Sequence, residues 1–233
     1  MGCSLDRLKP AALRPLVWLG NSKKNLRDFP DGAQKLLGDE LQLIQFGGMP
    51  KDAKPFKGVG SGVLEIALRS ASDAYRVVLA VQIGRRIYVL HAFQKKSKKG
   101  IETPKRDVEL IGKRYADRNW RMRTKRRKPV EFEEGSGNVF ADLGLKNADQ
   151  LLARAQIGFH VFKILEDKQL KQREIAEVLG IAQPDVSHLM NGHFSRFTTD
   201  KLLDFLKRLN RKVTIQVSRH HKGQPYQQVT FAP

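Results

Sequence analysis

The chain has 233 residues, of which 43 are Lys or Arg and 24 are Asp or Glu, so its formal net charge at pH 7 is +19. This charge favours polyanionic partners, of which nucleic acid is the commonest, and a hydrophobic share of 40% is enough for packed cores. Cys3, the only cysteine, excludes an intramolecular disulfide, and no apolar run approaches the about 20 residues of a membrane helix. We therefore expect a cytoplasmic protein without a membrane partner.

The first part of the chain, residues 14–120, changes between β-rich and helical patterns. PLVWLG at 15–20 is β-rich, and residues 22–47 carry apolar residues at helical spacing. Residues 54–96 hold three β-rich runs separated by turn signals, and a helical pattern returns after Pro104. The predicted order is β-α-α-β-β-β-α, which indicates a small α/β domain with two helices on an antiparallel sheet.

This part resembles the phage-derived, HigB-like type of toxin in the RelE/ParE superfamily. The resemblance is carried by KPFKG, LEIALRS, YRVVLAV and above all VLHAFQKKSKKGIETP at 89–104, and it covers nearly all of residues 14–120. It implies a domain that enters the ribosomal A site and cuts messenger RNA without a metal. The ribosome and mRNA are then the expected partners of this domain.

Cleavage of RNA without a metal uses the adjacent 2′-hydroxyl as nucleophile, so the enzyme must orient it, stabilise charge on the phosphate and transfer two protons. By resemblance, Arg76 on the central strand matches the phosphate-contacting arginine, and Lys95 and Lys96 match a basic cluster beyond the last strand. Lys54 and Lys57, in the loop before the sheet, are expected to bind RNA.

The general acid and base are less well defined by the sequence. His91 is one choice because its unperturbed pKa lies near neutrality; alternatively it is a structural histidine that shares a strand face with Val89 and Phe93. Tyr115 lies in a helical pattern that leaves its orientation open. The histidines show no HExxH spacing and no accompanying acidic cluster, so we expect neither a metal nor another cofactor.

A change of composition separates the two halves of the chain. RMRTKRRKP at 121–129 is the densest basic run, and a solvated linker is a better interpretation of it than a defined site. EFEEGSGNVFADLGL at 131–145 then switches to acidic and small residues. We predict a linker and arm over residues 121–147, between domains at 14–120 and 148–233.

The pattern of a helix-turn-helix occupies KQREIAEVLGIAQPDVSHLMNG at 171–192. A polar helix start, a small residue, a turn glycine and two core contacts fall at the required places, namely Gln172, Ala176, Gly180, Val186 and Leu189. Pro184 suits the first turn of the second helix, with Gln183 as its cap. An ordinary helical hairpin is the alternative, but it would not require so many positions to agree.

The rest of the second domain is expected to be mainly helical. A helix over 148–166 precedes the motif, and another over about 199–209 follows it, so that four helices enclose one core. KVTIQVS at 212–218 alternates like a strand, and YQQVTF at 226–231 is a second β-rich run. We predict a terminal strand or hairpin that makes the protein a homodimer through this domain.

The second motif helix, 183–191, is expected to lie in the major groove of operator DNA. Gln183 is the first choice for base reading because Gln pairs with adenine through two hydrogen bonds, and Gln172 is placed to hold a phosphate. The further DNA contacts predicted are Ser187, His188, Asn191 and Arg196, with His193 beside the DNA backbone. Asp185 is better explained as a favourable charge at the helix N-terminus.

GSGNVFADLGL closely resembles the start of HigA-like antitoxins of the Xre/Cro helix-turn-helix group. The resemblance implies an all-α, lambda-repressor-like domain, and hence an α+β chain overall. Such toxins and antitoxins are usually separate chains, so a single polypeptide departs from the pattern. A tether raises the effective concentration of a partner domain. We therefore expect a self-neutralised toxin–antitoxin fusion that represses its own transcription. The alternatives are a DNA-binding regulator with an inactive RelE-like domain, or a weakly restrained ribonuclease.

Overall fold

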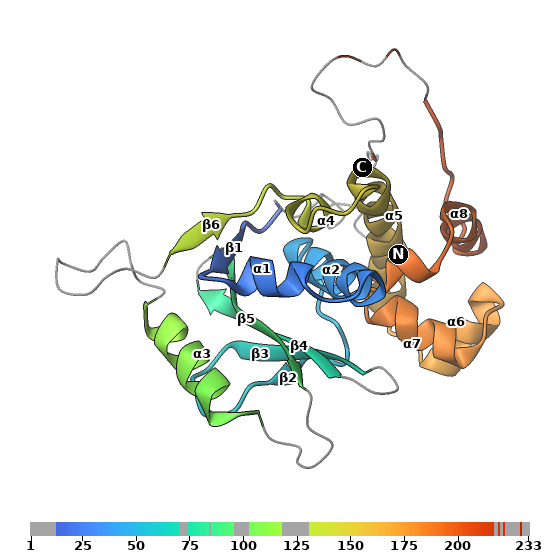
Figure 1. Ribbon diagram of the computed structural model, residues 1–233. Coiled ribbons are helices and arrows are strands. Elements are labelled where there is room, and N and C mark those ends of the chain that lie inside the picture. The colour runs from blue at the N-terminus through green and yellow to red at the C-terminus, as the bar shows by residue number, and fades with distance from the viewer. Residues whose placement is uncertain are drawn as a thin grey trace.

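A computed structural model describes residues 13–69, 74–83, 85–95, 103–117 and 131–216, together with residues 219, 221 and 229. The described chain forms a six-stranded sheet in the order β2-β3-β4-β5-β1-β6, with a group of helices beside it (Figure 1). The strands are β1 Leu16–Leu19, β2 Lys54–Pro55, β3 Val63–Arg69, β4 Ala74–Ile83, β5 Arg86–Lys95 and β6 Phe132–Glu134.

Helices cover both faces of the sheet. Helices α1 (Ser22–Arg27) and α2 (Asp31–Gln45) lie on one face, and α3 (Lys105–Asp117) lies on the other (Figure 1). Alternation along β4 produces two cores, because successive side chains of a strand point to opposite faces. Val77 and Leu79 pack with α1 and α2, whereas Val78 and Ala80 pack on the side of α3.

The predicted order of elements in this part of the chain matches except for one added strand, the two-residue β2 before β3, and the α+β fold class is confirmed for the chain as a whole. The sheet is more varied than the antiparallel meander that was predicted. Strands β3, β4 and β5 form the meander, but β1 pairs with β5 in parallel, in register Leu16↔Ile87. Helix α3 also covers the second face, so this sheet is buried on both sides.

A β-bulge in β5 changes the surroundings expected for His91. Val78 pairs with His91 while Leu79 pairs with Val89, so Leu90 is the extra residue. Simple alternation would place His91 on the same face as Val89, and that expectation is wrong. His91 instead faces α3 and stacks on Phe93 with ring centroids 5.3 Å apart, whereas Val89 packs on the side of α1 and α2.

The described half of the predicted linker and arm, residues 131–147, is folded onto the sheet at β6 and at the short helix α4 (Val139–Asp142). Strand β6 pairs antiparallel with β1, and the Gly135 N–H donates to the Leu16 carbonyl at 2.8 Å. Val139 and Leu143, in and just after α4, are buried in the core that α1 and α2 form with the sheet. Residues 131–145 are therefore packed against the first domain, while the basic run at 121–129 lies outside the described residues.

The remaining helices form one further core. They are α5 Ala148–Asp167, α6 Gln172–Leu179, α7 Gln183–Met190 and α8 Thr199–Arg208, with a 3-10 turn at Phe194–Arg196. Phe162, Phe194 and Phe205 are fully buried among them. Gly180, at a φ of 60°, ends α6 in the left-handed conformation that glycine adopts without strain. The helix-turn-helix is thus confirmed, although the N-cap of α7 is Ala182 rather than Gln183.

The predicted strand at 212–218 is not found over its described residues. Residues 212–216 carry no strand and are exposed, and Ile215 retains 76% of its accessible surface. A strand needs a partner for its N–H and C=O groups, and the described part of this chain offers none here. The second predicted run, 226–231, lies outside the described residues apart from residue 229. Within the described chain, no helix is long and apolar enough to cross a membrane.

Candidate functional site

Arg76 lies on the face of the sheet that α3 covers, in a small polar group that the strands bring together. Its guanidinium Nη1 lies 2.5 Å from Glu65 Oε1 on β3 and 3.4 Å from Thr103 Oγ1, just before α3. The Arg76 side chain is 14% exposed, and its Nε has no hydrogen-bond partner among the described residues. The cation is therefore positioned by one carboxylate, and its Nε is buried.

The predicted lysines surround this group to different degrees. Lys54 lies directly opposite Glu65 in the β2–β3 pair, so both side chains share one face. Lys95, at the end of β5, is two residues beyond Phe93 and pairs with Ala74, two residues from Arg76. Lys57 is exposed in the turn between β2 and β3. Lys96 lies outside the described residues. The sequence did not indicate Glu65 or Thr103, because their proximity to Arg76 depends on strand register.

His91 is buried beneath α3 and held between two side chains of that helix. Its Nε2 lies 3.1 Å from Asp107 Oδ1, and its Nδ1 lies 3.4 Å from Arg114 Nη1. Because Arg114 only donates, Nδ1 accepts and Nε2 carries the proton. Burial lowers the pKa of His91, the hydrogen bond to Asp107 opposes that change, and the charge of Arg114 adds to it. A neutral imidazole at 5% exposure fits the structural alternative better than a general acid.

Tyr115 also points from α3 toward the loop before β3. Its hydroxyl donates to the Ser61 carbonyl at 2.9 Å, and its ring lies against Gly60. This contact holds the end of α3 to the turn that contains Lys57. Among the described residues no group of three or more His, Cys, Asp or Glu side chains is arranged to hold a metal ion.

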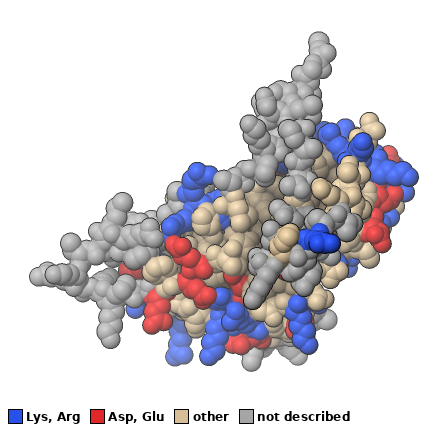
Figure 2. Space-filling view, turned by 90° about the horizontal axis from the view of Figure 1, so that it is seen from above, with Lys and Arg blue, Asp and Glu red and all other residues tan. Residues whose placement is uncertain are grey.

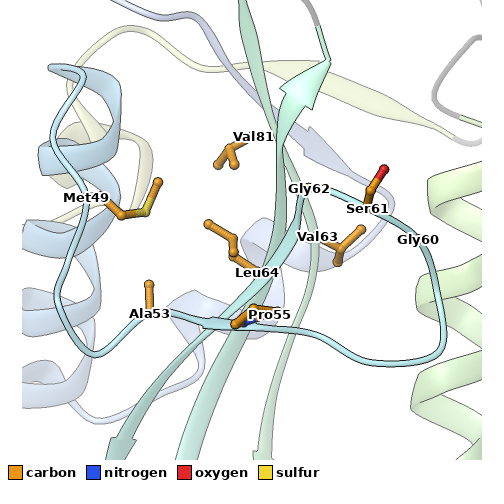
Figure 3. Close-up of a pocket in the computed structure, with 9 residues that line it drawn as sticks. All are labelled: Met49, Ala53, Pro55, Gly60, Ser61, Gly62, Val63, Leu64 and Val81. Atoms are coloured by element: carbon orange, nitrogen blue, oxygen red, sulfur yellow. The ribbon is translucent and has the colours of Figure 1, made fainter.

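A pocket of about 330 Å³ opens beside the first residues of β3 (Figure 3). Its lining consists of glycines, Ser61 and apolar side chains: Met49, Ala53, Pro55, Gly60, Gly62, Val63, Leu64 and Val81. None of the described residues that line it is charged, so this lining does not suit a phosphate group. The Arg76 group is separate from this pocket.

On the helix-turn-helix, the two ends of α7 have different surroundings. Gln183 and Pro184 at its first turn are exposed, and Ser187 and His188 are partly exposed. Gln172 at the first turn of α6 is partly exposed, and Arg196 is exposed beyond α7. Asn191, at the C-terminal end of α7, is by contrast only 3% exposed. Most of the predicted DNA contacts are therefore accessible, and Asn191 is covered.

The cover over Asn191 comes from the first domain. Asn191 Nδ2 donates to Asp52 Oδ2 at 2.8 Å, and Asn191 Oδ1 accepts from the Asp52 N–H at 2.9 Å. The methyl and methylene groups of Leu43, on α2, pack against Gly192 and belong to the core of the helical domain. The two domains thus share a packed interface at the end of the recognition helix.

Two further acids of α2 complete this interface. Asp39 Oδ2 accepts from the Ser195 N–H at 2.9 Å, and Glu40 Oε1 lies 2.5 Å from His193 Nε2. His193 Nδ1 in turn lies 3.0 Å from His188 Nδ1. Burial raises the pKa of Asp39 to about 7 and also raises the pKa of Glu40, although the hydrogen bonds from Ser195 and His193 oppose this. The sequence did not reveal these acids, since they meet partners more than a hundred residues away.

The distribution of charge on the surface is uneven. In the view of Figure 2, Lys and Arg side chains form separate groups with acidic side chains between them, and they do not form one continuous basic face. Among the described residues on this face, the basic side chains therefore offer separate patches to a polyanion.

Comparison with known protein families gives two matches. Residues 24–116 match the family "Phage derived protein Gp49-like (DUF891)", and residues 139–218 match the family "Helix-turn-helix domain". No curated protein and no solved structure matches the chain. The first match covers α1 to α3 of the sheet domain, and the second runs from α4 beyond α8. A Gp49-like domain of the RelE/HigB-like toxin superfamily is thus joined to a helix-turn-helix domain, a combination that supports a toxin–antitoxin fusion with a DNA-binding part.

Proposed function

We propose that this chain is a self-neutralised toxin–antitoxin protein of the HigB/HigA type. In this proposal the helix-turn-helix domain binds operator DNA and represses transcription, and it holds the Gp49-like domain as a latent, ribosome-dependent mRNA endonuclease. The observation that carries the proposal is the packed interface between α2 and residues 191–195, because it docks one domain on the other within a single chain.

Neutralisation in this arrangement does not require the RNA site to be covered. Arg76, Glu65 and Lys54 lie on the face of the sheet that α3 covers, whereas the helical domain docks on α2 at the opposite face. The docked domain adds bulk to the toxin domain, which must fit into the ribosome to reach mRNA. We therefore infer that neutralisation blocks access to the ribosome and that the docked helical domain does not itself cover the Arg76 group.

Arg76, with Lys95 and Lys96, is proposed to stabilise charge on the scissile phosphate, and Lys54 and Lys57 to hold the RNA backbone. The charge and the several N–H groups of a guanidinium, which suit phosphate oxygens, support this role for Arg76. Glu65 holds the Arg76 guanidinium in place through their ion pair. His91 is assigned an indirect role, in which its bonds to Asp107 and Arg114 fix α3 beside the site.

Operator binding is proposed to use Gln183 for a base and Gln172, Ser187, His188 and Arg196 for further contacts. A two-fold operator requires two copies of the chain. Residues 212–216 are exposed, with Val213 and Ile215 alternating with polar residues. We propose that they pair with the same segment of a second copy.

The alternative is a DNA-binding regulator whose sheet domain has lost catalysis. The observation in its favour is that Glu65 pairs with Arg76 and that His91 is buried. The two functions differ in what happens when the domains are separated, because only the first releases a nuclease.

The test uses the full chain with its interface broken. Asp39→Lys with Glu40→Lys places two cations against the Ser195 N–H and His193, so the domains should separate while α2 keeps its apolar face. In a cell-free translation reaction the wild type should leave synthesis intact, and the double variant should stop it. Adding Arg76→Ala should restore synthesis. Synthesis that is intact with the separated variant contradicts the nuclease and favours the regulator; a wild type that already stops synthesis contradicts neutralisation.

A further inference from the structure

The turn after the recognition helix presents donors that a DNA backbone would use. Protein contacts to DNA phosphates come largely from Arg and Lys, from Asn and Ser side chains, and from backbone N–H groups. Residues 191–195 offer such a set: the Asn191 amide, the His193 imidazole and the Ser195 N–H. In the docked chain all three are bonded to carboxylates of the first domain.

Asp52 is the most exposed of these three carboxylates. Asp39 and Glu40 are 1% and 6% exposed and lie under the interface, whereas Asp52 is exposed at its edge. Asp52 is held through two hydrogen bonds by Asn191, at the C-terminal end of the helix whose first turn carries Gln183. It therefore lies beside the surface that would meet DNA.

The surroundings of Asp52 hold both cations and acids. Burial is the largest cause that lowers the pKa of His188, the charges of Arg196 and His193 lower it further, and the charges of Asp185 and Asp52 raise it. This shows that the cations of residues 188–196 and the carboxylate of Asp52 lie within electrostatic reach of one another. Asp52 Oδ2 accepts from the Asn191 amide at 2.8 Å, as a phosphate oxygen would.

We propose that Asn191 is a binding site for a DNA backbone phosphate and that Asp52 of the toxin domain occupies this site as a phosphate substitute. This rests on the proposed DNA binding of the helix-turn-helix domain. DNA must displace Asp52 before a phosphate can bind the Asn191 amide. The chain therefore cannot keep residues 49–57 docked on Asn191 and bind DNA with full affinity at the same time. The toxin domain thereby sets the strength of operator binding.

The experiment measures binding of the full chain to fluorescein-labelled double-stranded DNA from immediately upstream of its own coding sequence, with a scrambled duplex for comparison. Asp52→Ala frees the Asn191 amide and should tighten binding about tenfold, the effect of one hydrogen bond to a charged acceptor. Glu109→Gln, which removes an equal charge at an exposed position of α3, should leave the affinity unchanged. Asn191→Ala should weaken binding and abolish the gain from Asp52→Ala.

Each result separates this inference from the function on which it rests. If the wild type binds DNA but Asp52→Ala does not tighten binding, the inference alone is overturned. The same holds if Asp52→Ala still tightens DNA binding when combined with Asn191→Ala, or if Glu109→Gln tightens it as well. If no form of the chain binds either duplex, DNA binding and the inference both fail. A readout that needs no variant is hydrogen exchange of the Asp52 amide, which donates to Asn191. The upstream duplex should accelerate it, and unchanged exchange in the DNA complex would contradict displacement.

Discussion

Replacing Asp39 by asparagine should make the chain more stable at neutral and alkaline pH. Asp39 is 1% exposed, and its Oδ2 accepts from the Ser195 N–H at 2.9 Å. An asparagine at this position would keep an oxygen acceptor of the same shape for this N–H and would carry no charge. Burial is unfavourable for the charged carboxylate of Asp39, and the neutral asparagine removes this unfavourable contribution.

The size and sign of the effect follow from that pKa. Because burial raises it from 3.8 to about 7, the folded chain binds a proton that the unfolded chain releases between these values. The stability that this carboxyl contributes is complete below about pH 4, falls as the pH rises to about 7, and is constant above. The total change is about 4 kcal/mol. Burial raises the pKa of Glu40 in the same direction, so the wild type depends on pH through both groups.

The assay is urea unfolding of the full chain at a series of pH values, followed by circular dichroism. The unfolding free energy of Asp39→Asn minus that of the wild type should increase from pH 4 to pH 8, by an amount on the order of 4 kcal/mol. Asp28→Asn, which removes an exposed carboxylate after α1, is the control and should show no such trend. A difference between Asp39→Asn and wild type that is the same at every pH would refute the reasoning.

Further predictions concern packing and capping, and all are measured by the same unfolding assay. Gly158→Ala places a Cβ in steric overlap with the ring of Phe194 and should cost about 1–3 kcal/mol. Gly112→Ala meets nothing within 4 Å in α3 and should instead stabilise by up to about 1 kcal/mol; equal effects at the two glycines would contradict the packing. Asn138→Ala removes the side chain that accepts two N–H groups of α4 and should cost about 1 kcal/mol. No loss there would show that α4 is not held by its cap.

Much of the fold could be predicted because periodicity reports burial directly. The helical spacing of Leu37, Leu41 and Ile44 follows from one buried face of α2, and alternation on β4 follows from its two cores. The helix-turn-helix was predicted nearly to the residue because Gly180 and the buried Val186 and Leu189 are constrained locally.

The features that escaped prediction depend on long-range geometry. Strand β6 has three exposed residues and joins the sheet through backbone bonds to β1, which leave no apolar pattern. The bulge at Leu90 changes the face of His91 without a glycine to mark it. Asp52 and Asn191 are 139 residues apart, and a surface acid gives no sign in the sequence of the partner that it will meet.

The candidate RNA site was predicted only in part for the same reason. Arg76 was chosen from the resemblance to the toxin family and Lys54 from its place before the sheet, but the pairing of Arg76 with Glu65 requires the β3–β4 register. The burial of His91 likewise depends on where α3 packs, which no local pattern specifies.

The central claim, a nuclease held latent by its own antitoxin domain, is tested most directly by the ends of the cleaved mRNA. Purified ribosomes translating one labelled mRNA would receive the wild type, the separated variant Asp39→Lys with Glu40→Lys, or that variant with Arg76→Ala. Attack by the 2′-hydroxyl predicts new 2′,3′-cyclic phosphate and 5′-hydroxyl ends with the separated variant alone, and only when ribosomes are present. Intact mRNA with the separated variant, or equal cleavage by all three proteins, would contradict the account.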